Sequence, residues 1–207
     1  MEIQANSRQI PKVQEICADK RYSDVLYTYL QSISEKRDSN TRVVAKEEVN
    51  FSKLANKFNL TRQTLSKKMK MLIETGLVSF DDGEKVYKLS ILENKRAALI
   101  PYETTKLLSD SLSEHAISTY VYLLNRYYAE GKPYVFTYEQ IKRFIGISTA
   151  TRSNDDTISN ILFVLQKIGL IKYSMKAQTQ EDTSFKNIKT IYQIEWVVNK
   201  VVKNLGE

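Results

Sequence analysis

Apolar residues return at helical spacing in two long segments of the chain, roughly residues 23–37 and 112–129. A repeat every three or four residues is typical of an amphipathic helix. The second segment follows Ser111 and has Glu114 three residues later, the pattern of a capping box. After each segment the pattern indicates a short extended stretch, a short helix, a tight turn and another helix. The sequence therefore predicts one order of elements twice.

The two halves also match each other residue by residue, as a diverged internal repeat. An insert, ATRSNDD at residues 150–156, separates two blocks of matches that each keep a constant offset. The second helix of each pair is expected to stop at Gly76 or Gly169, where a left-handed C-cap residue is typical. Two β segments follow each glycine. The matched residues are Leu54, Phe58, Leu60, Thr61, Leu65, Met69, Leu72, Gly76 and Leu77 with Ile141, Ile145, Ile147, Ser148, Ile158, Leu162, Leu165, Gly169 and Leu170.

Helix, strand, helix, turn, helix and two-stranded hairpin is the order of a winged helix-turn-helix. The segment FSKLANKFNLTRQTLSKKMKMLIETGLV resembles the helix-turn-helix of bacterial winged-helix regulators, with a polar N-cap and a closing Gly-Leu-Val. The second copy, through YVFTYEQIKRFIGIS to LQKIGLIKY, resembles the winged-helix modules of plasmid and phage replication initiators. We expect a mainly α fold with small β wings (α+β), built as two tandem winged helix-turn-helix domains. The expected parts are an arm at 1–19, a first domain at 20–92, a linker at 93–108 and a second domain at 109–207.

The helix after Thr61 has an apolar face and a basic face. Leu65, Met69, Leu72 and Ile73 form the expected core face, and residues 61–73 carry four positive charges and no negative ones. In helix-turn-helix proteins the start of the second helix enters the major groove, where Arg suits guanine and Gln suits adenine. In a helix that is not part of a helix-turn-helix, such a basic face is an ordinary solvated surface. The predicted DNA-binding residues here are Thr61, Arg62, Gln63, Thr64, Ser66 and Lys67, with Lys68 and Lys70 placed for phosphates.

The wings and the second copy supply further candidates. The first wing, FDDGEK, has a tight-turn signal at Asp82-Gly83. Its Lys85 and Lys88 are predicted phosphate ligands, although the turn could serve only as structure. The second wing contributes Lys176 and Lys186. The second reading helix, expected to start near Thr157, offers Arg152, Asn154, Thr157, Ser159 and Asn160.

The second reading helix is also more apolar than the first. Ile161, Phe163 and Val164 spread apolar surface around it, which suits packing better than solvent. Asp155 and Asp156 would repel a phosphate backbone unless they lie at the helix N-terminus, where the dipole favours them. DNA reading and protein contact are both open for this helix.

Composition changes the picture in two respects. The net charge of +7 and the pI of about 9.3 favour a polyanionic partner. The chain has one cysteine, Cys17, and one histidine, His115, and it contains no CxxC, HExxH or Walker A motif. The sequence therefore shows no site for an internal disulfide, a metal ion or a nucleotide. A tyrosine nucleophile would lack its accompanying histidines. We therefore expect no enzyme, no cofactor and no metal.

The function expected from these features is sequence-specific binding of double-stranded DNA. The resemblance of the second copy implies plasmid or phage replication initiation or control. The alternatives are a transcriptional regulator (repressor) of the same fold and a non-enzymatic docking adaptor among replication or partition proteins. We expect a homodimer, although tandem modules could also bind direct repeats as a monomer. The lack of an apolar run of 18 residues points to no membrane span, and we expect a cytoplasmic protein associated with nucleoid or plasmid DNA.

Overall fold

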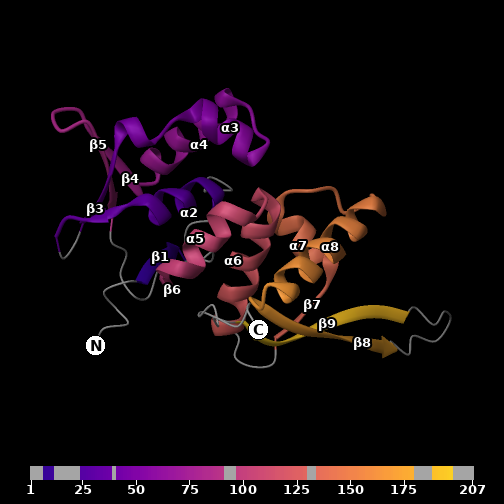
Figure 1. The fold of residues 1–207 in the computed structure, drawn as a ribbon. Helices are drawn as coiled ribbons and strands as arrows, with labels where there is room; N and C mark the ends of the chain where they lie inside the picture. The colour runs from indigo at the N-terminus through magenta and orange to yellow at the C-terminus, as the bar shows by residue number, and fades with distance from the viewer. Residues whose placement is uncertain are drawn as a thin grey trace, which may run out of the picture. The chain divides into compact units, whose positions relative to one another are not determined.

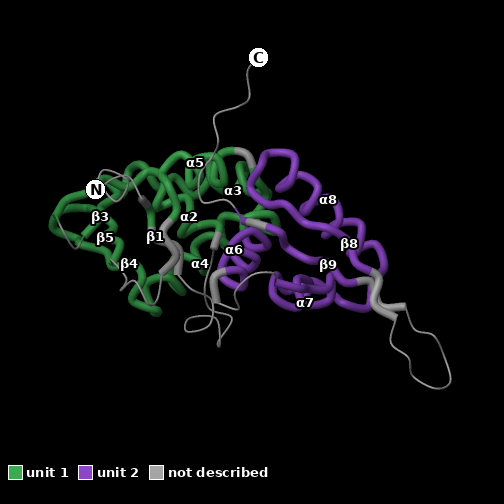
Figure 2. Tube along the Cα trace, turned by 90° about the horizontal axis from the view of Figure 1, so that it is seen from below, with its two compact units in different colours: residues 1–117 green, residues 118–207 purple. Residues whose placement is uncertain are grey.

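The computed structural model describes residues 7–11, 24–38, 41–90, 97–129, 134–179 and 188–197. Two compact units divide the chain, Met1–Ile117 and Ser118–Glu207 (Figure 2). Helix α6 (Glu114–Ala129) begins in the first unit and continues into the second.

The first unit contains the predicted elements of the first winged helix, in the predicted order (Figure 1). These are α2 (Asp24–Ile33), β3 (Thr41–Ala45), α3 (Phe51–Phe58), α4 (Arg62–Glu74), β4 (Val78–Asp81) and β5 (Val86–Ser90). A 3₁₀ turn, η3 (Lys46–Glu48), joins β3 to α3. The short strand β2 (Glu35–Lys36) extends the antiparallel sheet to the order β2-β3-β5-β4.

Two strands and one helix lie outside this winged helix. Strand β1 (Ser7–Pro11) pairs antiparallel with β6 (Ala97–Pro101), and Ser7 lies opposite Pro101. Helix α5 (Tyr102–Ser111) follows β6 and packs against α2. The predicted arm thus contains a paired strand, and most of the predicted linker forms β6 and α5.

The second unit repeats the order of the first. After α6 come β7 (Tyr134–Phe136), α7 (Tyr138–Ile145), α8 (Ser153–Lys167), β8 (Ile171–Thr179) and β9 (Ile188–Val197). Its sheet has the order β7-β9-β8, in which each strand is the counterpart of β3, β5 or β4. The internal repeat predicted from the sequence is therefore present in the topology.

Helix ends in the two copies use the same backbone devices. Asn59 ends α3 and Gly146 ends α7, both in the left-handed region at φ 52° and 78°. Gly76 and Gly169 follow α4 and α8 at φ 72° and 74°. A β-carbon is strained at such angles, which is why glycine is usual there. The predicted left-handed glycines are confirmed.

Each unit buries an apolar core of its own. The helix-turn-helix of the first unit contributes Leu54, Phe58, Leu65, Met69 and Leu72, all of them buried. In the second unit Tyr120, Leu124 and Tyr127 of α6 are buried, as the sequence predicts. They share that core with Phe136, Ile141, Ile158, Leu162, Leu165 and Ile194.

Two predicted bounds of the long helices are wrong. The first long helix ends at Ile33 rather than at residue 37, because the chain turns into β2 at Glu35. The second begins at Glu114, and Ser111 is instead the last residue of α5. Its cap is Ser113, whose Oγ accepts a hydrogen bond from the Ala116 N–H at 3.3 Å.

Two predictions for the reading helices are also wrong. Helix α8 starts at Ser153, within the insert, and not near Thr157. Ile73, predicted to face the core, is 41% exposed, because it lies beyond the edge of the buried stripe formed by Leu65, Met69 and Leu72.

Candidate nucleic-acid interface

The turn between α3 and α4 fixes the start of the first reading helix. The left-handed Asn59 reverses the chain, and the Leu60 N–H donates to the Ala55 carbonyl at 2.9 Å. Thr61 then caps α4, because its Oγ1 accepts a hydrogen bond from the Thr64 N–H at 3.0 Å. The predicted N-cap is confirmed, and the first turn of α4 is held in one conformation.

The exposed face of α4 begins at its first residue. Arg62, Gln63, Ser66 and Lys67 are all exposed. Within the described part of the chain, no ion pair or hydrogen bond engages these four side chains. Guanidinium, amide, hydroxyl and ammonium groups thus lie together on the first two turns with no internal partner. This is the chemistry expected of groups that contact base edges.

The remaining candidates on α4 already have partners. Lys68 forms an ion pair with Glu114, and the two side chains are only 21% and 23% exposed. Lys70 lies 3.8 Å from Glu74 in an exposed pair, which contributes little energy. The Thr64 hydroxyl bonds to Thr61 at 2.8 Å. Lys68 is therefore less available to phosphate than its place in the sequence suggests.

The cations of the first wing are paired with carboxylates of the same hairpin. Lys85 contacts Asp82 at 2.7 Å, while Lys88 contacts Asp81 at 2.6 Å. The Asp81 carboxylate also accepts hydrogen bonds from two backbone N–H groups of the turn, each at 3.0 Å. The turn lies where the sequence places it, and its acidic side chains both shape it and neutralise its lysines.

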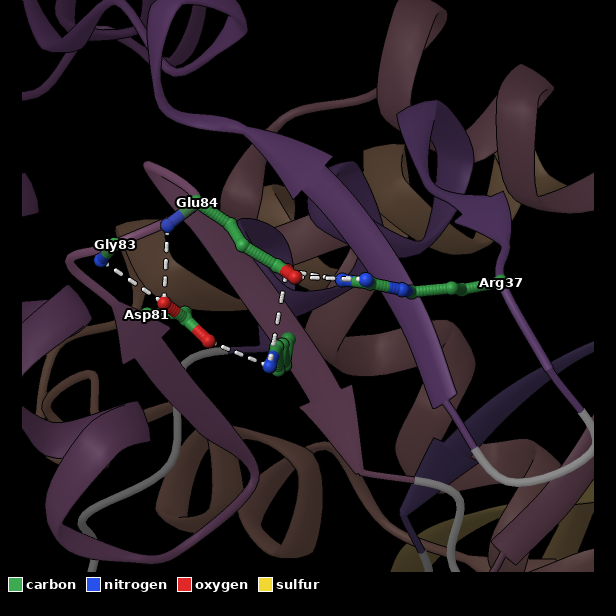
Figure 3. Close-up of polar contacts among 5 residues, drawn as sticks. Arg37, Asp81, Gly83 and Glu84 are labelled. Carbon is green, nitrogen blue, oxygen red and sulfur yellow. Dashed lines mark hydrogen bonds and ion pairs between the residues drawn. The ribbon is translucent and has the colours of Figure 1, made fainter.

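Arg37, at the end of β2, joins this group from outside the hairpin. Figure 3 shows the side chains of Arg37 and Glu84 pointing toward each other, and the guanidinium donates to both carboxylate oxygens, one of them at 2.7 Å. Glu84 also lies 3.8 Å from Lys88. Sequence reasoning missed Arg37, since only the tertiary fold brings residues so far apart in the chain together.

These contacts shift the pKa values of Asp81, Glu84 and Arg37. The hydrogen bond from Lys88 lowers the pKa of Asp81, and the hydrogen bond from Arg37 lowers the pKa of Glu84. The same bond to Glu84 raises the pKa of Arg37. All of these groups are accessible to solvent, so water screens their contribution to stability.

In α8, part of the predicted reading surface is used inside the second unit. The Asn154 amide donates to the Ser148 carbonyl at 2.7 Å, and the Thr157 hydroxyl donates to the Ser153 carbonyl at 3.4 Å. Arg152 and Asn160 are exposed and Ser159 is half-buried. The Asn154 bond ties the first turn of α8 to Ser148, which precedes the insert, and so supports the early start of α8.

An ion pair between α7 and α8 also fixes the start of α8. Asp155 contacts Lys142 at 2.6 Å, and Lys142 is only 3% exposed. The Lys142 ammonium also donates to the Thr151 carbonyl at 3.4 Å. Asp155 and Asp156 lie in the first turn of α8, as the sequence suggests. No pattern in the sequence singles out Lys142.

The middle of α8 presents apolar side chains to solvent. Phe163 is 55% exposed and Val164 is 40% exposed.

Near the start of the helix an open pocket of ≈ 680 Å³ is lined by Arg152, Asp156 and a stacked pair of tyrosines. The rings of that pair, Tyr138 and Tyr192, lie 4.4 Å apart at an angle of 4°. The two reading helices therefore differ in chemistry, although they occupy equivalent places in the fold.

The second wing is described only in part. Lys176 is exposed on β8, which runs further than the predicted β segment, whereas Lys186 lies outside the described residues. The described helices include none that is long and apolar enough to cross a membrane. Across the same described ranges, no group of three or more His, Cys, Asp and Glu residues could hold a metal ion.

Of the comparisons with known proteins, the one with solved structures gives a match. No protein-family model matches the chain, and no curated protein matches it. Among solved structures, the chain is similar to the Pi initiator protein crystallised in complex with iteron DNA. That similarity covers 91% of this chain and 96% of the other, with 10% sequence identity and a TM-score of 0.43.

Proposed function

We propose that the chain binds double-stranded DNA sequence-specifically, with α4 reading base edges in the major groove. The observation that carries this proposal is a set of four exposed side chains on the first two turns of α4 that have no partner among the described residues: Arg62, Gln63, Ser66 and Lys67. The N-terminal part of the second helix is the part that reads bases in a helix-turn-helix.

The chemistry of these side chains supports a division of work. Arg62 can donate two hydrogen bonds to guanine, and Gln63 can pair with adenine; each good bidentate contact contributes about 1–3 kcal/mol of discrimination. Lys67 can bond to a base edge or neutralise a phosphate, and Lys70 supplies further positive charge for phosphates. Because phosphate contacts release counterions, binding should weaken steeply as salt rises.

The biological role that we propose is initiation or control of plasmid or phage replication. Its support is the resemblance of the second copy to the winged-helix modules of replication initiators. A transcriptional repressor of the same fold would use α4 in the same way.

The test is a selection of bound duplexes from a random library, at low and high salt. The wild-type chain should enrich one motif that persists at high salt, and the Arg62→Ala/Lys67→Ala variant should enrich none. Lys106→Ala, an exposed lysine on α5, is the matched control and should retain the motif. A double variant that selects the same motif as the wild type would rule out α4 as the reader.

A specific observation favours a second function for the other unit, which is docking of a protein partner through α8. Phe163 and Val164 are exposed there, and two of the predicted base-reading side chains are bonded internally. The Arg152→Ala variant separates the two roles in the same selection. If α8 reads DNA, the enriched motif should shorten; if α8 docks a protein, the motif should be unchanged.

A further inference from the structure

Four charged side chains of the first unit form a single group, which we call the wing ion network: Arg37, Asp81, Glu84 and Lys88. Figure 3 labels Arg37, Asp81 and Glu84. Lys88 lies between the two carboxylates, 2.6 Å from Asp81 and 3.8 Å from Glu84. Glu84 also receives both guanidinium hydrogen bonds from Arg37. Two positive and two negative charges therefore cancel on the surface of the hairpin that follows α4.

We propose that Asp81 and Glu84 restrain the sequence-independent affinity of the protein for DNA by holding Lys88 and Arg37 in ion pairs that compete with phosphate. This inference rests on the proposed DNA binding by α4. It assigns the wing acids a role that opposes binding, whereas α4 supports it.

The geometry of the Arg37–Glu84 contact supports competition. A guanidinium presents a planar fork of donors that matches carboxylate and phosphate oxygens in the same bidentate way. Glu84 occupies that fork with its two oxygens. A phosphate can therefore bind the Nη1–Nη2 edge of Arg37 only when Glu84 leaves.

The ion pairs are weak enough for phosphate to replace a carboxylate, but breaking them still costs some binding free energy. The side chains of Arg37 and Glu84 are 46% and 43% exposed, and those of Lys88 and Asp81 are 33% and 32% exposed. Exposed pairs of this kind contribute little to stability, so they do not lock the cations permanently. Their carboxylates offset the positive charge that Arg37 and Lys88 would otherwise offer to DNA, and that charge sets binding to arbitrary sequences.

The test uses Glu84→Gln and Asp81→Asn in the full-length chain, with affinity measured for a random duplex over a range of salt. Both changes keep side-chain shape, and Asn retains the oxygen that accepts the turn hydrogen bonds at position 81. Each variant should bind more tightly, by roughly eightfold at 0.1 M salt if the released cation neutralises one additional phosphate. The slope of log affinity against log salt should steepen by about 0.9.

Two controls make the result specific. Glu103→Gln removes the same charge from an exposed position on α5, and should change affinity and slope much less. The Arg37→Gln/Glu84→Gln double variant removes the released cation as well, and should fall back toward the wild type. Hydrogen exchange of the β4 and β5 amides shows whether each variant keeps the hairpin, and either variant that keeps it decides the matter.

The outcomes also separate this inference from the proposed function. If wild-type binding does not depend on Arg62 and Lys67, the reading role of α4 fails. If that dependence holds but the two wing variants match Glu103→Gln, the inference about the wing is overturned and the DNA-reading role of α4 stands.

Discussion

Lys67 and Lys68 are neighbours on α4, yet they occupy different electrostatic environments. Lys67 is exposed and has no partner among the described residues, whereas Lys68 is partly buried against Glu114. A phosphate could attract Lys67 without breaking any contact inside the protein. To attract Lys68 it would have to displace a carboxylate.

This difference predicts unequal effects of two otherwise identical substitutions. Lys67→Ala should remove one phosphate contact, lowering affinity roughly eightfold at 0.1 M salt and the salt slope by about 0.9. Lys68→Ala should leave the slope nearly unchanged, because its charge is already balanced. Salt titrations of duplex binding measure both quantities. Equal losses in the two variants would mean that Glu114 does not hold Lys68 back from DNA.

At this scale the sequence predicts which residues face the core, because a period of 3.6 residues places Leu65, Met69 and Leu72 on one stripe. It also places Arg62 and Gln63 on the opposite face. It does not predict the partner of Lys68, since Glu114 is distant along the chain. Ion pairs depend on the tertiary fold and leave no periodic signal.

The side chain of Thr61 caps the start of helix α4. The Thr61 Oγ1 satisfies the Thr64 N–H, one of the donors that lack a partner within the first turn. The proposed base-reading residues Arg62 and Gln63 lie directly after this cap. Its hydrogen bond therefore contributes to holding them in a helix before DNA is bound.

Removing the cap should loosen the reading surface. Thr61→Ala should cost about 1 kcal/mol of helix stability, which corresponds to roughly fivefold faster hydrogen exchange at the start of α4. Thr61→Ser keeps the accepting oxygen and should stay close to the wild type. Exchange rates of the Thr64 and Leu65 amides, which both donate to Thr61, measure the effect. Similar rates in the Ala and wild-type chains would show that the cap contributes nothing.

The sequence predicts this helix start but misses two others, for a physical reason. Thr61 precedes a clear change from turn to periodic pattern. For α6 the spacing of Ser111 and Glu114 predicts the wrong serine, and the cap in the structure is Ser113. For α8 the start depends on Asn154 and Asp155 bonding to residues outside the helix.

The molecule as a whole is one fold used twice with different surface chemistry. The strand orders β3-β5-β4 and β7-β9-β8 are equivalent in the two copies. The first copy has a basic reading helix and a neutralised wing. The second has an acidic start to its reading helix, held by the nearly buried Lys142.

This arrangement predicts a stability difference between two adjacent aspartates in the second copy. Asp155→Asn leaves the Lys142 ammonium without its counter-charge and should destabilise the second unit by about 1–3 kcal/mol. Asp156→Asn changes the same charge at an exposed site and should cost less than about 1 kcal/mol. The single tryptophan of the chain, Trp196, lies in β9, so urea unfolding followed by its fluorescence reports on this unit. Identical midpoints for the two variants would contradict the role of Asp155.

The pairing of β1 with β6 has a consequence for the synthesis of the protein. Ser7 pairs with Pro101, so the entire first winged helix is made between the two strands. At translation rates of roughly 5–20 residues per second, β1 leaves the ribosome roughly 5 to 20 seconds before its partner. Helices and hairpins form within microseconds, so the helix-turn-helix has time to fold while the nascent chain still has one unpaired strand. Closure of the first unit is thus a late event, and a nascent chain stalled before residue 97 would carry the reading helix without the strand pair that closes its unit.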